Sequence, residues 1–174
     1  MPLIYITGVA GSGKSTVLNE LKNFGYITYE ADENISSWEH KVTRKRISKS
    51  NHKLTTDPQF FNEHDWYIDK NEVNKIAQTA KYQTVFICGS VANEDEVWGY
   101  FDKVFCLYID DKTLKQRIMS RTDKDFGKSK HELNHLLQLN DNIYRKYTAL
   151  GAVIIDSNKP PKEIANKIIQ SLAS

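Results

Sequence analysis

Residues 8–16 carry the clearest chemical pattern in the sequence. The run Gly8-Val9-Ala10-Gly11-Ser12-Gly13-Lys14-Ser15 fits G-x-x-x-x-G-K-[ST], the Walker A pattern of a phosphate-binding loop, or P-loop. Glycines let backbone N–H groups curl around an anion, and the N-terminus of a following helix adds partial positive charge. Lys14 is therefore predicted to reach the β- and γ-phosphates of a nucleotide, and the Ser15 hydroxyl to bind Mg²⁺.

The segments on either side of this loop supply the context that it requires. The apolar run Leu3-Ile4-Tyr5-Ile6 precedes it and is typical of a buried strand, and apolar residues at helical spacing follow it up to Gly25. Four further short apolar segments cover residues 26–29, 84–89, 103–109 and 151–156. Helical patterns separate them, so the chain predicts a five-stranded parallel sheet with helices on both faces.

Acidic residues follow the second predicted strand, in Glu30-Ala31-Asp32-Glu33. Open α/β sheets bind ligands at the carboxyl ends of their strands, so Asp32 is predicted to be a base toward a hydroxyl acceptor or a holder of Mg²⁺. Alternatively, these acids only begin a helix, where negative charge suits the dipole. The third strand ends at Cys88-Gly89, without the aspartate common there, and Glu94 and Asp95 lie outside the expected register. Ser15 and Asp32 are the predicted metal ligands.

Residues 33–69, which we call the insert, are harder to interpret. Six basic residues and no acid lie between Lys41 and Lys53, among them Arg44 and Arg46. This stretch could bind an anionic acceptor or form a solvated helix face. An aromatic cluster follows, consisting of Phe60, Phe61, Trp66 and Tyr67. Such rings either stack on a planar substrate, with Trp66 as the candidate, or pack the insert onto the core.

Arg117 and Arg121 are four residues apart in a predicted helix, which places them on one face. A polar, glycine-containing loop over residues 122–130 follows them. Two arginines beside such a loop suit a clamp on transferring phosphates, and an exposed helix with scattered ion pairs is the alternative. His131 and His135 are also four apart, but no third ligand accompanies them, so no metal site is predicted there.

Composition narrows the class of protein. The chain has 174 residues, 40% of them hydrophobic and 26% charged, which is typical of one globular domain. A net charge of +2 gives no electrostatic case for nucleic acid or membrane. Cys88 and Cys106 lie inside apolar runs and are predicted to be buried thiols. The predicted first strand leaves no room for a signal peptide, and no apolar run could cross a membrane, so a cytoplasmic location is expected.

The pattern as a whole resembles the small P-loop kinases, a group of nucleoside, nucleoside-monophosphate and shikimate-type kinases that includes bacterial AAA-type nucleoside kinase-like proteins. The resemblance covers nearly the whole chain and rests on residues 8–16, Asp32, 88–90, 117–128 and 151–160. It implies an α/β, three-layer P-loop NTPase fold with sheet order 2-3-1-4-5. It also implies a single domain over 1–174, a substrate-binding insert over 33–69 and a short lid loop over 122–130.

The resemblance implies ATP and Mg²⁺ as cofactors and a small-molecule phosphoryl acceptor. The residues implied for ATP are Gly11, Ser12, Gly13, Lys14, Ser15, Thr16, Arg117 and Lys159. Those implied for catalysis are Lys14, Asp32, Arg117 and Arg121. Those implied for the acceptor are Asp32, Arg44, Arg46, Trp66 and Gly89.

The predicted function is ATP- and Mg²⁺-dependent phosphoryl transfer to a nucleoside monophosphate or nucleoside, by a monomer or homodimer. A kinase of a small hydroxyl metabolite is one alternative. An ATP-binding module without transfer is another, because the third strand lacks its terminal aspartate. The basic stretch 41–53 is the one feature that suggests a polynucleotide kinase. A GTPase is disfavoured, because Asn158-Lys159-Pro160-Pro161 lacks the aspartate of a base-reading Asn-Lys-x-Asp.

Overall fold

The computed structural model describes residues 1–47, 57, 59–122 and 125–172. Its main sheet has five parallel strands. The sheet order is β2-β5-β1-β6-β7. The strand bounds are β1 Leu3–Thr7, β2 Ile27–Glu30, β5 Val85–Cys88, β6 Lys103–Tyr108 and β7 Val153–Asp156. Counted along the chain, these are the first to fifth core strands, so the predicted order 2-3-1-4-5 is confirmed.

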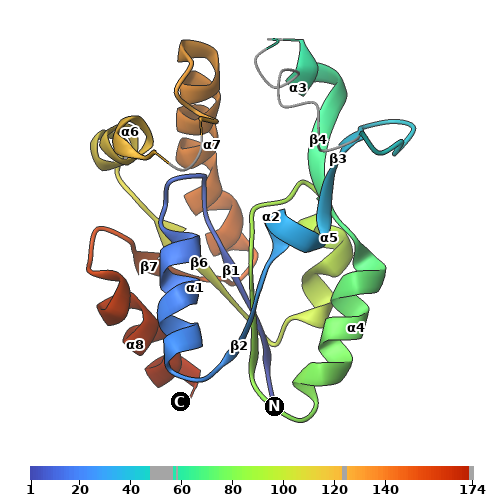
Figure 1. Ribbon diagram of the computed structural model, residues 1–174, viewed down its shortest axis with the longest axis vertical. Helices are drawn as coiled ribbons and strands as arrows, with labels where there is room; N and C mark the ends of the chain where they lie inside the picture. Colours follow the sequence, from blue (N-terminus) through green and yellow to red (C-terminus); the bar gives the residue numbers. More distant parts are fainter. Residues whose placement is uncertain (48–56, 58, 123–124, 173–174) are drawn as a thin grey trace.

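Helices cover both faces of this sheet, which confirms the three-layer fold (Figure 1). Side chains of β1 alternate between the two faces, as in any strand. Ile4 and Ile6 pack with the helices α1 (Lys14–Asn23) and α8 (Pro161–Leu172). Tyr5 packs on the other face, which is covered by α4 (Lys70–Ala80), α5 (Glu94–Val97), the 3₁₀ turn η2 (Trp98–Tyr100) and α7 (Lys130–Ala149). The helix α6 (Asp111–Ser120) packs against α7.

The insert contains an antiparallel hairpin that the sequence did not predict. Its strands are β3 (Ser36–His40) and β4 (His64–Ile68), flanked by the short helices α2 (Ala31–Asn34) and α3 (Phe60–Glu63). Trp38 pairs with Trp66 across the hairpin, and its ring also contacts those of Phe60 and Phe61. These ring contacts of Trp38 pack the insert internally. The hairpin rises above the carboxyl edge of the main sheet, opposite α6 and α7 (Figure 1).

Capping side chains mark the starts of two helices, and both cysteines lie in strands. Asp69 caps α4 by accepting the Asn71 N–H at 2.9 Å, and Ser129 caps α7 in the same way. Cys88 and Cys106 are buried thiols, as predicted, and burial raises the pKa of Cys106 to about 12. Within the described ranges, no helix combines the length and apolar character that crossing a membrane requires.

Candidate functional site

The P-loop connects β1 to α1 at the carboxyl edge of the sheet. Gly13 adopts the left-handed conformation, with φ of 96°, and no side chain caps the N-terminus of α1. A Cβ on Gly8 would lie 2.8 Å from the Leu107 carbonyl oxygen, so a side chain cannot fit there. The buried Lys14 donates from Nζ to the carbonyls of Gly8 (2.7 Å) and Val9 (3.1 Å). This loop, with an uncapped helix N-terminus and a lysine folded over it, fits a nucleotide's phosphates.

The carboxylate that contacts Ser15 is Glu30, which was not among the predicted metal ligands. The Ser15 hydroxyl donates to Glu30 Oε1, and Glu30 is the last residue of β2. Glu30 lies opposite Cys88 in the parallel register of β2 and β5. The strand β5 ends at Cys88 without a carboxylate, and the neighbouring strand β2 supplies one, Glu30, beside Cys88. Serine and carboxylate oxygens are the ligands that Mg²⁺ prefers.

Asp32 lies two residues farther on, in the first turn of the short helix α2, as the alternative of a helix start for these acids expected. Its Oδ1 accepts a hydrogen bond from the Trp66 indole N–H at 3.0 Å, which joins Asp32 to the hairpin. Gly89 lies close by, because a Cβ on it would be 2.7 Å from that of Ala31. The structure therefore brings together three of the residues predicted to bind the phosphoryl acceptor, namely Asp32, Trp66 and Gly89.

The side chain of Glu94, a candidate for the acid that β5 lacks at its end, is buried and hydrogen-bonded. It is 1% exposed and accepts hydrogen bonds from Thr7 (3.3 Å), Lys146 (2.9 Å) and the Tyr147 hydroxyl. These contacts connect α7 to the end of β1. In the described part of the chain, no group of three or more His, Cys, Asp or Glu side chains forms a ready metal site. A metal bound at Ser15 and Glu30 would need water or phosphate oxygens as further ligands.

Arg117 joins the P-loop to the loop that follows β7. Its Nη2 donates to the Ser157 carbonyl at 2.8 Å, and its Nη1 lies 3.4 Å from the Ser12 carbonyl oxygen. The buried Ser157 hydroxyl also donates to the Ser12 carbonyl, so Ser157 contacts the P-loop although it was not among the residues predicted for ATP. Its position after the last strand was the signal in the sequence. Thr16 and Lys159, both predicted for ATP, are exposed.

Arg121 does not share a helical face with Arg117, so that prediction is wrong. The helix α6 ends at Ser120, and Arg121 has extended backbone angles. Its guanidinium donates to the Phe126 carbonyl in the lid loop. The lid loop is fixed from its other end by the buried Glu132, which accepts the Gly127 N–H at 3.0 Å and the Ser129 hydroxyl at 2.9 Å. Of the predicted lid loop, residues 123–124 lie outside the described residues.

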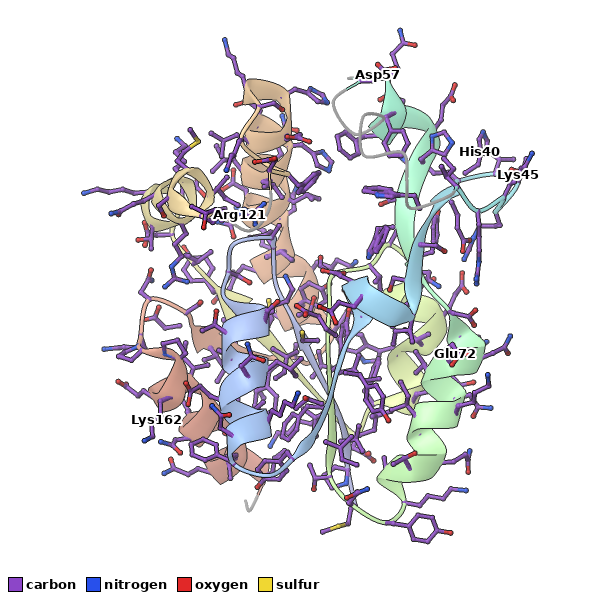
Figure 2. All side chains as sticks on the ribbon, viewed as in Figure 1. His40, Lys45, Asp57, Glu72, Arg121 and Lys162 are labelled. Carbon is purple, nitrogen blue, oxygen red and sulfur yellow. The ribbon has the colours of Figure 1, made fainter. Side chains whose placement is uncertain are left out.

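The two arginines predicted for an anionic acceptor are paired with carboxylates. Arg44 binds Glu39 (2.9 Å) and Glu96 (3.0 Å), and its guanidinium lies 3.8 Å from the centre of the Tyr67 ring. Arg46 binds Glu39 (3.3 Å) and Asp69 (2.6 Å). The hydrogen bond from Arg46 lowers the pKa of Asp69. Figure 2 shows Lys45, which lies between the two arginines in the chain, at the hairpin's outer end and away from α6 and α7. Lys49 and Lys53 of this basic stretch lie outside the described residues.

These ion pairs predict a structural role for the two arginines. Changing both residues to glutamine (Arg44→Gln with Arg46→Gln) leaves the buried Glu39 without either cation. We expect the free energy of unfolding to fall by about 1–3 kcal/mol, measured by urea titration. The Michaelis constant for the acceptor should change less than about twofold, because a purely structural arginine does not contact the acceptor. The control Lys45→Gln should change stability by less than about 0.5 kcal/mol. A large rise in that Michaelis constant with unchanged stability would contradict this prediction.

Comparisons with known proteins agree with this geometry. A family model described as an AAA domain matches residues 4–138. Dephospho-CoA kinases of Streptococcus pyogenes are 24% identical over 196 residues, which cover 99% of this chain and 97% of the relative. A shikimate kinase from Bacteroides thetaiotaomicron has a TM-score of 0.65 at 15% identity, covering 99% of both chains. Deoxyadenosine kinase from M. mycoides, solved with dATP, has a TM-score of 0.59 at 18% identity and covers 100% of both chains. These solved structures share the fold.

Proposed function

We propose a specific reaction for this chain, which belongs to the AAA domain family and is a small P-loop kinase. In this reaction, the protein transfers the γ-phosphoryl group of ATP to a hydroxyl group of a small acceptor. A nucleoside is the first candidate for that acceptor, and the reaction depends on Mg²⁺. The observation that carries the proposal is a pair of carboxylates at and just after the end of β2. Glu30 contacts Ser15, and Asp32 accepts a hydrogen bond from Trp66.

The nucleotide side of the proposal rests on the P-loop and Arg117. The N-terminus of α1 and Lys14 would bind the β- and γ-phosphates. Arg117 and Ser157 would lie beside the nucleotide's base, because they connect the P-loop to the loop after β7. When bound at Ser15 and Glu30, Mg²⁺ would neutralise charge on the phosphates. Arg121 would approach the γ-phosphoryl group from the lid loop.

The acceptor side of the proposal favours a hydroxyl over a phosphate. A phosphate acceptor needs cations, whereas Arg44 and Arg46 are already paired with Glu39, Asp69 and Glu96. A hydroxyl acceptor needs a group that takes its proton, and Asp32 is a suitable base. In the transfer, the acceptor oxygen bonds to the γ-phosphorus, the bond from that phosphorus to the β–γ bridging oxygen breaks, and ADP leaves. The hydroxyl proton moves to the Asp32 carboxylate.

An acceptor screen tests this function. Purified protein, labelled ATP and Mg²⁺ would be incubated with matched pairs such as adenosine and AMP, and with shikimate and dephospho-CoA. We expect phosphorylated product from a hydroxyl acceptor and at least about tenfold lower kcat/KM for its monophosphate, a difference of about 1.4 kcal/mol. A preference for AMP over adenosine would contradict the hydroxyl proposal. Transfer to no acceptor, with ATP still bound, would instead favour the ATP-binding module without transfer.

A further inference from the structure

Phe61 of the insert contacts the lid loop and the helix that follows it. Its ring stacks on His135, with centroids 4.7 Å apart and planes 8° from parallel, and also on His131, at 5.8 Å and 27°. The Phe126 ring meets it edge-on, at 6.2 Å and 73°. Phe126 belongs to the lid loop, and both histidines belong to the first half of α7. We call this set of four rings the insert–lid contact.

The insert–lid contact is linked by one hydrogen bond to Arg121, the residue proposed to act on the γ-phosphoryl group. The backbone carbonyl of Phe126 accepts the hydrogen bond from Arg121. The next residue, Gly127, has φ of 96°, and a Cβ on it would lie 2.7 Å from Leu136 Cδ1, so the loop backbone is packed tightly on α7. The Phe126 ring and the carbonyl that orients the Arg121 guanidinium belong to one residue, so we expect a change in the packing of the ring to displace the carbonyl.

We infer that Phe61 is a positioning residue for phosphoryl transfer, which sets the orientation of Arg121 through the insert–lid contact. This inference rests on the proposed function, in which Arg121 acts on the γ-phosphoryl group. It gives the insert a second task besides acceptor binding. When the insert packs against the lid loop, Phe61 presses on Phe126, and Arg121 is aligned. Loss of the Phe61 ring is expected to disturb this alignment and to slow transfer.

The surroundings of His135 supply a reporter for the contact that does not depend on activity. Burial lowers the pKa of His135 below its ordinary value, and the neighbouring charges of His131 and Lys41 act in the same direction. The Phe61 ring is stacked on this imidazole. Asp65, on β4, acts in the opposite direction. Removing the Phe61 ring exposes His135 to water and should raise its pKa toward that of a free histidine.

The test compares Phe61→Leu with the control Tyr67→Leu. Tyr67 is an aromatic residue of the same insert, and its ring packs against the Arg44 guanidinium. The probe is Mg²⁺·ATP without acceptor, and its hydrolysis gives kcat and KM. We expect Phe61→Leu to lower kcat about ten- to a hundredfold with KM changed less than about twofold, because it misplaces a group that acts in the transition state. Tyr67→Leu should leave kcat within about twofold of the wild type.

Two further measurements separate positioning from general damage. NMR titration should show a higher His135 pKa in Phe61→Leu and an unchanged one in Tyr67→Leu. His135→Leu, which removes the contact from the side of α7, should lower kcat less than additively when combined with Phe61→Leu. An unshifted His135 pKa, or a wild-type kcat in Phe61→Leu while Lys14→Ala is inactive, would overturn this inference alone. If wild type and Lys14→Ala hydrolyse ATP equally slowly and the acceptor screen gives no transfer, the proposed function fails and the inference fails with it.

Discussion

Lys14→Ala is expected to reduce ATP turnover by at least about 10³-fold. The Lys14 ammonium is the one P-loop cation, and it lies buried over the loop, 2.7 Å from the Gly8 carbonyl. When ATP binds, this group can turn to the β- and γ-phosphates, where negative charge increases in the transition state. Removing it in a water-poor site takes away both binding and catalysis.

The measurement is ATP hydrolysis and transfer under saturating Mg²⁺, alongside circular dichroism to verify the fold. Lys22→Ala is the matched control, because Lys22 is an exposed lysine in the last turn of the same helix. The control should keep turnover within about twofold of the wild type. Turnover that survives in folded Lys14→Ala would show that residues 8–15 do not bind the reacting phosphates.

Glu30→Gln is expected to lower kcat about 10²-fold and to raise the Mg²⁺ concentration needed for half-maximal activity. The substitution keeps the size of the side chain and a hydrogen-bond acceptor for Ser15, but it removes the negative charge that a divalent cation requires. A hundredfold loss corresponds to about 2.7 kcal/mol, within the usual range for a group that acts on charge in the transition state. Activity measured over a Mg²⁺ titration gives both quantities.

Asp32→Asn separates the role of the second carboxylate from that of Glu30. Asparagine still accepts the Trp66 hydrogen bond but cannot take a proton. We expect a loss of about 10²–10⁴ in kcat for a hydroxyl acceptor, with an unchanged Mg²⁺ requirement. Glu33→Gln, an exposed acid in the same short helix, is the control. If Asp32→Asn rather than Glu30→Gln shifts the Mg²⁺ requirement, the proposed roles of the two carboxylates must be exchanged.

The proposed roles of the carboxylates differ from the sequence-based expectation for a definable reason. The apolar and β-branched run predicted a second strand that ends at Tyr29, with Glu30 as the first residue of an acidic turn. In the structure, Glu30 is the last residue of β2 and lies at the level of Cys88 on the neighbouring strand. A boundary shift of one residue changes which side chain points along the sheet edge, because side chains alternate along a strand. No local pattern indicated which acid would meet Ser15.

The hairpin was missed for a similar reason. The strands β3 and β4 are separated by residues 41–63, so no short turn signal joins them. Their pairing depends on contacts such as Trp38 with Trp66 and on the ion pairs of Arg44 and Arg46. A run of basic residues indicates positive charge, but its partners come from segments as distant as Glu96. The prediction of an anion-binding stretch could not include those partners.

The sequence alone was sufficient for features that depend on near neighbours. Apolar runs predicted the parallel strands, and the spacing of Gly8, Gly13 and Lys14 predicted the P-loop. Each arises from backbone conformation or burial within a few residues. The tertiary structure alone decided that Glu30 meets Ser15, that Arg121 turns to Phe126, and that Phe61 reaches α7. These contacts join segments brought together by packing, and the free energy of packing is shared by the whole core rather than encoded in any one motif.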